Sequence, residues 1–188
     1  MTINFRNLYK LAPAALVAGM GLLVTSCFED EKTTAEKYED WRLQNEKYVA
    51  DAEAKKAPDG SPYYTKIVPS WAPNAYVLVH WHNDRSLTAS NLSPMDNSTT
   101  QITYELFNVE GDRISDSFAN RDSVYTSRPS SNIVGMWAAL THMNVGDTVT
   151  MVIPFQAGYG ESSYSDILPY STLVYNVKLK AITAYEIP

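Results

Sequence analysis

The sequence has almost no cysteine: Cys27 is the only one among 188 residues. A single thiol cannot form a disulfide within the chain and cannot supply a thiolate cluster for a metal. Basic side chains are also in the minority, with 15 Lys and Arg against 21 Asp and Glu and a net charge of −6. Because binding to phosphate backbones needs basic patches, this balance argues against a nucleic-acid partner.

Long hydrophobic runs are confined to one place near the start of the sequence. Leu11–Val24 is an apolar run of 14 residues preceded by two basic residues. It is too short to span a bilayer comfortably and is typical of a secretory signal peptide, which we place at residues 1–26. The small residues just before Cys27 resemble a bacterial lipobox, which implies cleavage before Cys27 and lipidation of its thiol. An ordinary signal peptide followed by an incidental cysteine is the alternative.

The same segment predicts where the protein resides. We expect a protein that is lipid-anchored through Cys27 in the envelope of a Gram-negative-type bacterium, at the outer membrane, on the periplasmic face or the cell surface. The acidic run Glu29–Glu31 resembles the surface-export signal of some outer-membrane lipoproteins, and it fits a solvated tether equally well. Several acyl chains on one cysteine hold a membrane firmly, whereas one chain binds only marginally.

Residues 35–56 predict a helix ahead of the main domain, with Thr33 or Thr34 as its cap. Apolar and aromatic residues recur at helical spacing on one narrow stripe, namely Tyr38, Trp41, Tyr48, Val49 and Ala52. The stripe favours a spacer helix that docks on the domain; a helix that binds a second copy or a client is the alternative. The turn at Pro58–Pro62 marks the predicted boundary between the tether with its helix (27–60) and the domain (61–188).

Few residues suggest metal, nucleophilic or phosphate chemistry. His80 and His82 have the spacing of metal ligands on one face of a predicted strand, but no third ligand is close in sequence. We find neither a Ser-His-Asp arrangement nor a Gly-rich phosphate loop. The sequence therefore predicts no metal and no cofactor.

The most specific pattern lies between residues 133 and 182. It contains, in order, Ile133 with Gly135, then Met143, Val145, Gly146 and Asp147, then Ile153-Pro154, Tyr159-Gly160, Ile167 with Pro169, and Thr172 to Leu179. This order resembles the C-terminal half of FKBP-type peptidyl-prolyl isomerases. Residues 94–117 resemble the segment that precedes it in that family. The resemblance covers roughly half the chain.

The resemblance implies an α+β fold: an FKBP-like bent antiparallel β-sheet wrapped over one short helix, here preceded by the amphipathic helix. The short helix is expected from Ile133 to Met143, with Asn132 as its cap. Strands are expected at 63–68, 75–82, 148–154 and 172–182, with an edge strand within 121–132.

The resemblance also implies a pocket. Tyr159, between two glycines, takes the hydroxyl-donor position and Tyr104 lines the wall, so these two are the candidate catalytic residues. The candidate substrate contacts are Ile114, Ile133, Met136, Ile167 and Tyr175. Plain core packing is the alternative interpretation of such residues on strands.

Three positions depart from the family pattern. Met136 stands where the family has a tryptophan, with Trp137 one residue further on, and Ile114 replaces an aromatic residue. Ser115 takes the place of the family aspartate, and Asp116 follows one position late, able to reach the pocket only if the strand bulges.

The function implied by the resemblance is cis–trans isomerisation of X–Pro bonds in exported proteins, with proline-containing polypeptides as partners. The departures keep two alternatives open: a non-catalytic FKBP-like binding module, or a surface lipoprotein with a degenerate pocket whose helix does the work.

Overall fold

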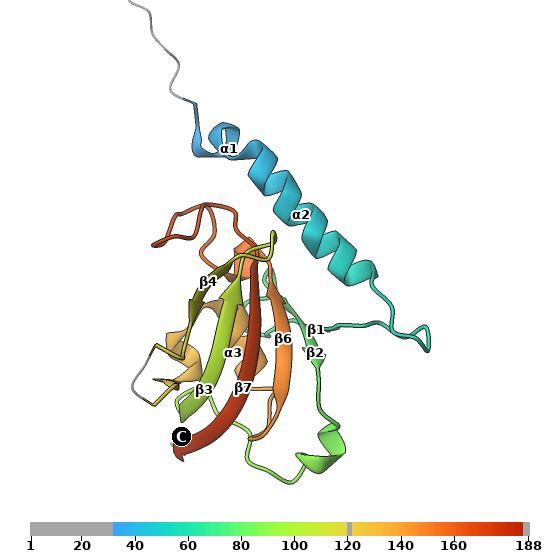
Figure 1. Cartoon of the computed structure of the whole chain (residues 1–188), viewed down its shortest axis with the longest axis vertical. Coiled ribbons are helices and arrows are strands. Elements are labelled where there is room, and N and C mark those ends of the chain that lie inside the picture. The colour runs from blue at the N-terminus through green and yellow to red at the C-terminus, as the bar shows by residue number, and fades with distance from the viewer. Residues whose placement is uncertain (1–31, 120–121, 186–188) are drawn as a thin grey trace, which may run out of the picture. The chain divides into compact units, whose positions relative to one another are not determined.

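The computed structural model describes residues 32–119 and 122–185 (Figure 1). The predicted signal peptide at residues 1–26 and the predicted lipidation site, Cys27, lie outside the described residues. No helix within the described ranges is long and apolar enough to cross a membrane. Residues 32–188 group as one unit, which holds the helices and the sheet. The domain limits expected from the sequence stay predictions.

Seven antiparallel strands form one sheet in the order β1-β2-β6-β7-β3-β4, with β5 also paired to β3. The strands are β1 (Thr65–Ile67), β2 (Val77–Trp81), β3 (Thr99–Phe107), β4 (Arg113–Asp116), β5 (Tyr125–Ser127), β6 (Thr148–Ile153) and β7 (Leu173–Ala184). The last strand in sequence, β7, lies in the middle of the sheet between β6 and β3 (Figure 1). A bent antiparallel sheet with one short helix, as expected, is confirmed.

The N-terminal helix is present as α1 (Thr34–Lys37) and α2 (Glu39–Ala54). Thr33 caps it as expected: its hydroxyl accepts from the Glu36 N–H at 3.3 Å, and the Glu36 carboxylate accepts from the Thr33 N–H at 2.8 Å. This reciprocal capping box satisfies donors that a helix start otherwise leaves unpaired.

The short helix is α3 (Val134–Leu140), and it ends before Met143, where the sequence placed its end. The expectation that Asn132 caps it is wrong, since the N-cap residue is Ile133 and no side chain bonds there. The 3₁₀ turn η2 (Pro129–Ser131) comes immediately before, and the Asn132 side-chain amide donates to the Arg128 carbonyl at 2.7 Å instead.

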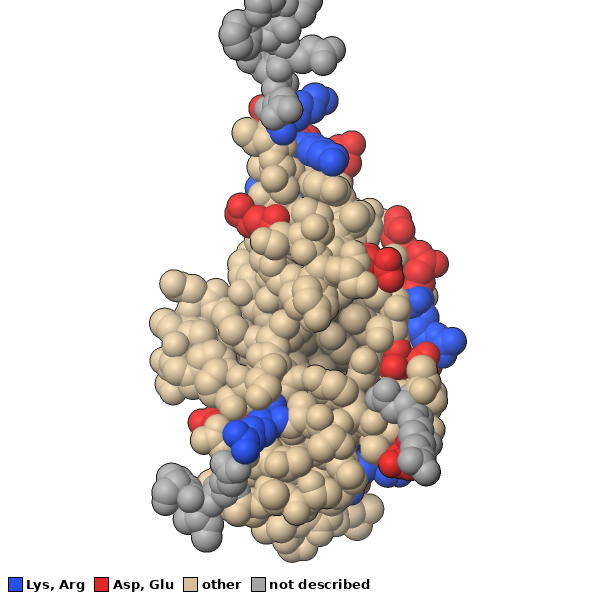
Figure 2. Space-filling model, turned by 90° about the vertical axis from the view of Figure 1, so that its left-hand side faces the viewer, with Lys and Arg blue, Asp and Glu red and all other residues tan. Residues whose placement is uncertain are grey.

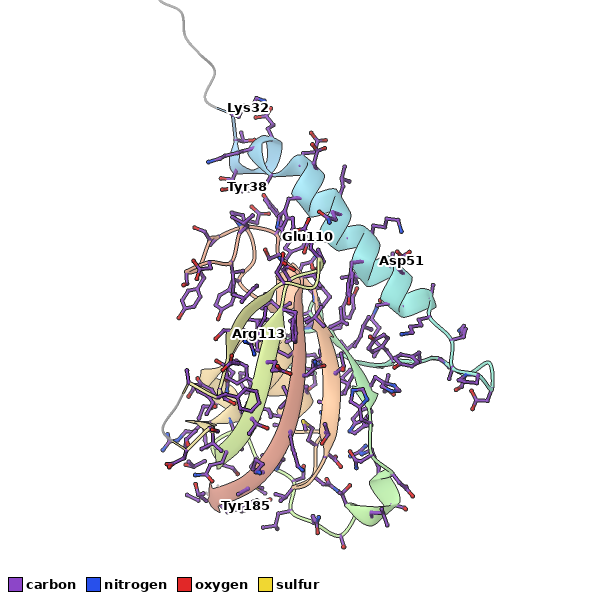
Figure 3. All side chains as sticks on the ribbon, viewed as in Figure 1. Lys32, Tyr38, Asp51, Glu110, Arg113 and Tyr185 are labelled. Atoms are coloured by element: carbon purple, nitrogen blue, oxygen red, sulfur yellow. The ribbon has the colours of Figure 1, made fainter. Side chains whose placement is uncertain are left out.

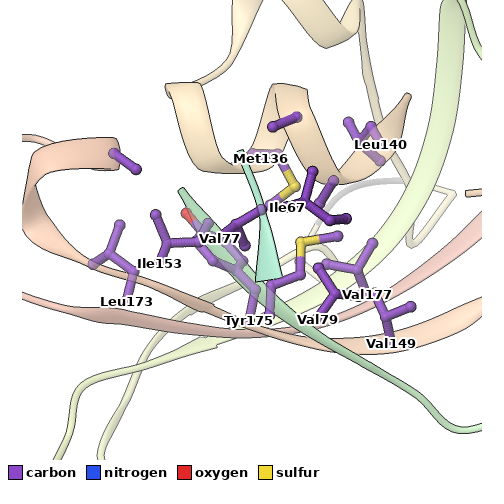
Figure 4. Packing of buried hydrophobic residues seen from close by; sticks show 14 of the residues in the cluster. Ile67, Val77, Val79, Met136, Leu140, Val149, Ile153, Leu173, Tyr175 and Val177 are labelled. Carbon is purple, nitrogen blue, oxygen red and sulfur yellow. The ribbon is translucent and has the colours of Figure 1, made fainter. Parts of the chain in front are cut away.

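One face of the sheet, called here the α3 face, packs against α3 and buries the main core. Figure 4 shows Met136 and Leu140 of α3 opposite side chains of the sheet, among them Val77, Val79, Val149, Ile153, Leu173, Tyr175 and Val177. A Cβ on Gly135 would lie 2.4 Å from Cγ2 of Ile153, so the helix approaches β6 this closely only because that residue is glycine.

The opposite face, called here the α2 face, is covered at one end by α2. Val49 and Ala52 pack on Leu78 of β2 and Val152 of β6. Figure 3 shows the β3–β4 turn with Glu110 beside the N-terminal half of α2, where the Gln44 amide donates to the Glu110 carboxylate at 3.3 Å. The helix is therefore docked on the domain.

Polar bonds fix where α2 docks. Asn45 is fully buried, and its side-chain oxygen accepts from the Thr172 N–H at 2.6 Å. Its amide nitrogen donates to the Trp41 carbonyl at 2.7 Å, and the Trp41 indole donates to the Ser171 hydroxyl at 3.1 Å. Hydrogen bonds thus join α2 to Ser171 and Thr172, the two residues immediately before β7.

A buried carboxylate ties the loop after β2 to the turn before β6. Asp147 is fully buried and accepts from Thr88 Oγ1 at 2.5 Å, Asn83 Nδ2 at 3.0 Å and the Asn144 N–H at 2.9 Å, with Arg85 Nε 3.5 Å away. Burial raises the pKa of the Asp147 carboxyl. The hydrogen bonds and Arg85 outweigh burial, so this pKa lies below its ordinary value.

Candidate functional site

A cavity of about 900 Å³ lies between the sheet and the start of α3, bounded by the loop that precedes β7. This volume is within the usual range of small-ligand pockets, about 300–1,000 Å³. Its lining residues are Ile102, Tyr104, Leu106, Ile114, Ser115, Tyr125, Ser131, Asn132, Ile133, Met136, Tyr159, Tyr164, Ser165, Asp166, Ile167 and Tyr175. Figure 2 shows the side of the molecule that carries β4 and this loop; most charged side chains there lie towards the margins.

All seven candidate pocket residues line this one cavity: Tyr104, Ile114, Ile133, Met136, Tyr159, Ile167 and Tyr175. They come from β3, β4, the start of α3, the loop before β7, and β7 itself. Three of them, Met136, Ile167 and Tyr175, are also buried members of the core, so packing and pocket are not exclusive interpretations. The catalytic and binding roles assigned to the seven stay predictions.

A bulge in β4 decides which of its residues face the cavity. Ser115 pairs with Leu106 and Arg113 pairs with Phe107, so Ile114 is the extra residue between them. Consecutive residues Ile114 and Ser115 therefore both line the cavity. The strand bulges as the sequence argument required, but one step too early to bring in the next residue, Asp116.

Asp116 lies outside the cavity lining. Its carboxylate sits 3.4 Å from the Arg113 guanidinium and accepts from the Phe118 N–H at 2.8 Å. The family's aspartate position is filled by Ser115, whose hydroxyl lies 3.3 Å from the Tyr104 hydroxyl. A neutral hydroxyl pair thus occupies the place where the resemblance implied a carboxylate.

Tyr159 stands on the loop that follows η3 (Phe155–Ala157). The next residue, Gly160, has φ +67° and both donates to the Phe155 carbonyl and accepts from the Tyr170 N–H, each at 2.9 Å. The glycine is required at this φ, and its two bonds tie the ends of the loop together. Burial, followed by the nearby Tyr164, raises the pKa of Tyr159, so its hydroxyl stays protonated and able to donate.

The cavity floor is Met136, which is 4% exposed. Trp137, one residue later, turns away from the cavity, stacks on Trp71 with ring centroids 3.8 Å apart, and donates its indole N–H to Asp96. The floor is thus a flexible thioether rather than an aromatic plate.

Tyrosine rings dominate the walls. Tyr104 meets Tyr175 at 5.7 Å and Tyr125 at 5.8 Å between ring centroids, both edge to face, while Tyr159 and Tyr164 stack in parallel at 4.4 Å. Burial raises the pKa of Tyr175 well above its ordinary value. Five tyrosines therefore surround one cavity.

Sequence reasoning missed Ile102, Leu106, Ser131 and Asn132 as lining residues, and it also missed a second group of four, Tyr125, Tyr164, Ser165 and Asp166. Tyr125 lies on β5, the edge strand expected within a polar loop, and pairs opposite Ile102. The other three immediately precede Ile167, a residue already assigned to the pocket. The only signal available was this closeness in sequence to an assigned residue.

The two histidines of β2 do lie together, with ring centroids 4.9 Å apart. His80 Nδ1 is bonded to the Tyr63 carbonyl and His82 Nε2 to the Thr150 hydroxyl, each at 2.8 Å. Within the described part of the chain, no group of three or more His, Cys, Asp and Glu side chains is placed to hold a metal ion.

Residues 91–180 match the family model of FKBP-type peptidyl-prolyl cis-trans isomerases. Among solved structures, the fold is similar to that of a peptidyl-prolyl cis-trans isomerase from Pseudomonas syringae, with 21% identity, a TM-score of 0.62, and coverage of 77% of this chain and 95% of that one. It is also similar to FkpA from Escherichia coli, with the same identity and TM-score and coverage of 80% of this chain and 64% of FkpA. Among curated protein sequences, none matches this chain.

Proposed function

Because the chain contains an FKBP-type domain, we propose that it catalyses cis–trans isomerisation of X–Pro peptide bonds in exported proteins of the cell envelope. The observation that carries this proposal is the meeting of seven candidate residues, from separate parts of the sequence, at one cavity. The cavity has room for a proline with its neighbours.

The reaction needs no nucleophile, metal or cofactor. Rotation about an X–Pro bond is opposed by a barrier of about 20 kcal/mol that arises from amide resonance. Resonance separates charge in the planar amide, and the twisted transition state loses that separation at the C–N unit. A water-poor, aromatic-lined cavity disfavours the planar form relative to the twisted one. Such a lining would be supplied by Tyr104, Met136 and Tyr175.

Two donors would hold the substrate carbonyls. The Tyr159 hydroxyl lines the cavity and stays protonated. Ile133 lines the cavity too and is the N-cap residue of α3. Its N–H therefore takes no part in the hydrogen bonds within the helix. Hydrogen bonds from these donors would fix the flanking carbonyl while the prolyl bond rotates.

The envelope location in this proposal rests on the leader pattern and on Cys27. A lipidated Cys27 would hold the domain at the outer membrane, with residues 28–33 and the N-terminal helix as spacer. Labelling cells with a clickable palmitate analogue tests it: the wild-type protein is expected to take up label, and Cys27→Ala is expected to lose it. Equal labelling of the two would contradict the anchor.

A non-catalytic binding module is the second candidate. The specific observation in its favour is the Ser115–Tyr104 hydroxyl pair, together with the engagement of Asp116 by Arg113 outside the cavity. A cavity without an acid would still hold a proline-containing segment through its aromatic walls.

One experiment separates these two candidates. Exchange NMR on a proline-containing peptide measures both binding and isomerisation by the full chain in nonionic detergent. We expect Tyr159→Phe to lower kcat/KM about tenfold, since one lost hydrogen bond is worth about 1.4 kcal/mol. Tyr38→Phe, the same change at a tyrosine outside the cavity lining, is the matched control and is expected to leave the rate unaltered.

The possible results divide the candidates clearly. A wild-type rate equal to the uncatalysed one rejects the isomerase, and binding that survives Tyr159→Phe then favours the binding module. A catalysed rate that Tyr159→Phe and Tyr38→Phe leave equally intact would remove Tyr159 from the mechanism.

A further inference from the structure

Among the residues that the structure describes, Asp166 is the only formally charged side chain in the cavity lining. None of the described lysines, arginines and histidines lines the cavity. Asp166 is exposed, and within residues 32–119 and 122–185 its carboxylate has neither a hydrogen-bond donor nor a cationic partner. A negative charge therefore stands at the cavity with nothing in the described structure to neutralise it.

A tight turn holds Asp166 next to an exposed aromatic ring. Tyr164 and Ile167 exchange two backbone hydrogen bonds of 2.9 Å, which leaves Ser165 and Asp166 as the two central residues. Ser165 has φ +50°, as the first central residue of a type II′ turn requires. The two hydrogen bonds thus hold the ends of the turn together, and both Tyr164 and Asp166 line the cavity.

The Tyr164 ring has one covered and one open side. It stacks on Tyr159 with an angle of 6° between the ring planes, yet it remains 58% exposed. An aromatic face next to an unpaired carboxylate is the arrangement that attracts a cation, because both the ring face and the carboxylate are negative. Lysine and arginine fit it well, since their aliphatic stems pack on a ring while the charged end reaches further.

We infer that this pocket selects prolines flanked by lysine or arginine, with Tyr164 and Asp166 as the specificity-determining residues. The inference rests on the proposed function in that the proline ring occupies the cavity between Tyr104, Met136 and Tyr175. The side chain next to the proline then lies over Tyr164 with its charge towards Asp166. A glutamate at the same position meets the like charge and is disfavoured.

The expected preference is modest because the pair is solvent-exposed. An exposed ion pair changes an equilibrium or rate by about two- to fivefold. Its electrostatic part is screened by salt, with a Debye length of about 8 Å at 0.15 M and about 3 Å at 1 M. A preference that comes from Asp166 therefore shrinks as the salt concentration rises.

Two series of blocked peptides test the inference, one with Lys, Gln or Glu directly before the proline and one with the same residues directly after it. Exchange NMR with the full chain in nonionic detergent gives the Kd and the isomerisation rate of each peptide. The expected order at one of the two positions is Lys above Gln above Glu, by about two- to fivefold per step. We expect Asp166→Asn to remove the disadvantage of Glu and to narrow the advantage of Lys to the part that the Tyr164 ring supplies. Glu161→Gln removes one charge from the same loop outside the cavity lining and is expected to keep the wild-type order.

Each outcome decides. Equal Kd and equal rates for the Lys and Glu peptides in both series overturn the inference, as does an order that Asp166→Asn leaves unchanged. If no peptide is isomerised faster than in buffer, the catalytic function fails. A Lys preference in Kd that Asp166→Asn narrows would still support the inferred recognition of lysine or arginine.

Discussion

The two faces of the sheet are held by different kinds of interaction. On the α3 face, twenty of the described side chains form one buried apolar cluster, whereas the buried cluster on the α2 face consists of Val49, Ala52, Leu78 and Val152. The small cluster is supplemented by directional bonds from Asn45 to Thr172 and from Trp41 to Ser171. Apolar burial stabilises without specifying an exact register, and hydrogen bonds between buried groups do specify it. The α3 face thus supplies stability, and the α2 face supplies an exact position for α2.

The position of α2 matters because its hydrogen bonds end at Ser171 and Thr172, next to the cavity loop. Ser171 and Thr172 follow Tyr170, whose N–H bonds to the Gly160 carbonyl at the other end of the cavity loop. Tyr170 is 3% exposed and has φ +62°, which a bulky side chain rarely adopts, so its surroundings must hold it there. The Arg42 guanidinium lies over its ring at 5.8 Å. Helix α2 therefore contacts the root of the loop that carries Tyr159 and Asp166.

Identical substitutions on the two faces give the largest expected effects and test the comparison directly. Leu179→Ala on the α3 face and Leu78→Ala on the α2 face both remove a buried leucine. Such changes lower the free energy of unfolding by about 2–5 kcal/mol, and the loss grows with the cavity that remains. We expect Leu179→Ala to be the more destabilising in urea denaturation, since it leaves a cavity inside a cluster of twenty buried side chains, whereas Leu78 belongs to a cluster of four. Equal losses would mean that the two faces are packed alike.

The second prediction concerns the pH dependence of stability, because the turn between α3 and β6 contains a buried charged group, Asp147. Its folded-state pKa is lowered. The stability it contributes is therefore complete above the ordinary aspartate pKa of about 3.9 and is lost as the pH falls through the lower folded value. We expect Asp147→Asn to reduce stability at pH 7 by about 2 kcal/mol, the worth of its charge-assisted hydrogen bonds. Urea denaturation at pH 7 and below pH 4 measures this, and the difference in the free energy of unfolding between wild type and variant should narrow in acid.

Asp59→Asn is the control, because Asp59 is an exposed carboxyl that in the described structure is bonded only to the nearby Ser61. A constant difference across this range would contradict the assignment.

The directional bonds of the α2 face give the smallest of the three effects on stability. Asn45→Ala leaves the Thr172 N–H without its acceptor and is expected to cost about 1–2 kcal/mol. It is also expected to speed amide hydrogen exchange in residues 158–172, since α2 then no longer fixes the root of the loop. Glu46→Ala, at an exposed position of the same helix next to Asn45, is the control. Faster exchange in α2 alone, with an unaltered loop, would show that the two are not coupled.

The sequence predicted the features that rest on a repeated pattern. The helical stripe, the Thr33 cap and the strands β1, β2, β6 and β7 follow from periodicity and short-range bonding. The seven cavity residues follow from the ordered resemblance. Asn45 was missed although it lies four residues after Trp41 and four before Val49, on the same stripe. A polar residue there is normally taken as facing solvent, and only the distant Thr172 gives it a buried partner.

The errors around the site have the same origin. The Asn132 cap, and the possibility that a bulge would bring Asp116 into the pocket, were both judged from neighbours in sequence. The first depended on the turn at Pro129–Ser131 and the second on the exact position of the bulge at Ile114. Tyr125 reaches the cavity through its pairing with β3, which no local pattern reports, whereas Tyr164 lies only three residues before the assigned Ile167.

The central place of β7 has a consequence for the order of events during synthesis. Strands β1, β2 and β6 form one half of the sheet and β3, β4 and β5 the other, and β7 alone joins them. Residues 173–184 leave the ribosome after all the other described strands. The hydrogen bond that positions α2 also forms late, because Thr172 is synthesised 127 residues after Asn45. The main core contains side chains of β7, so it cannot be completed before this strand is synthesised, and we expect folding that depends on contacts so distant in sequence to be slow.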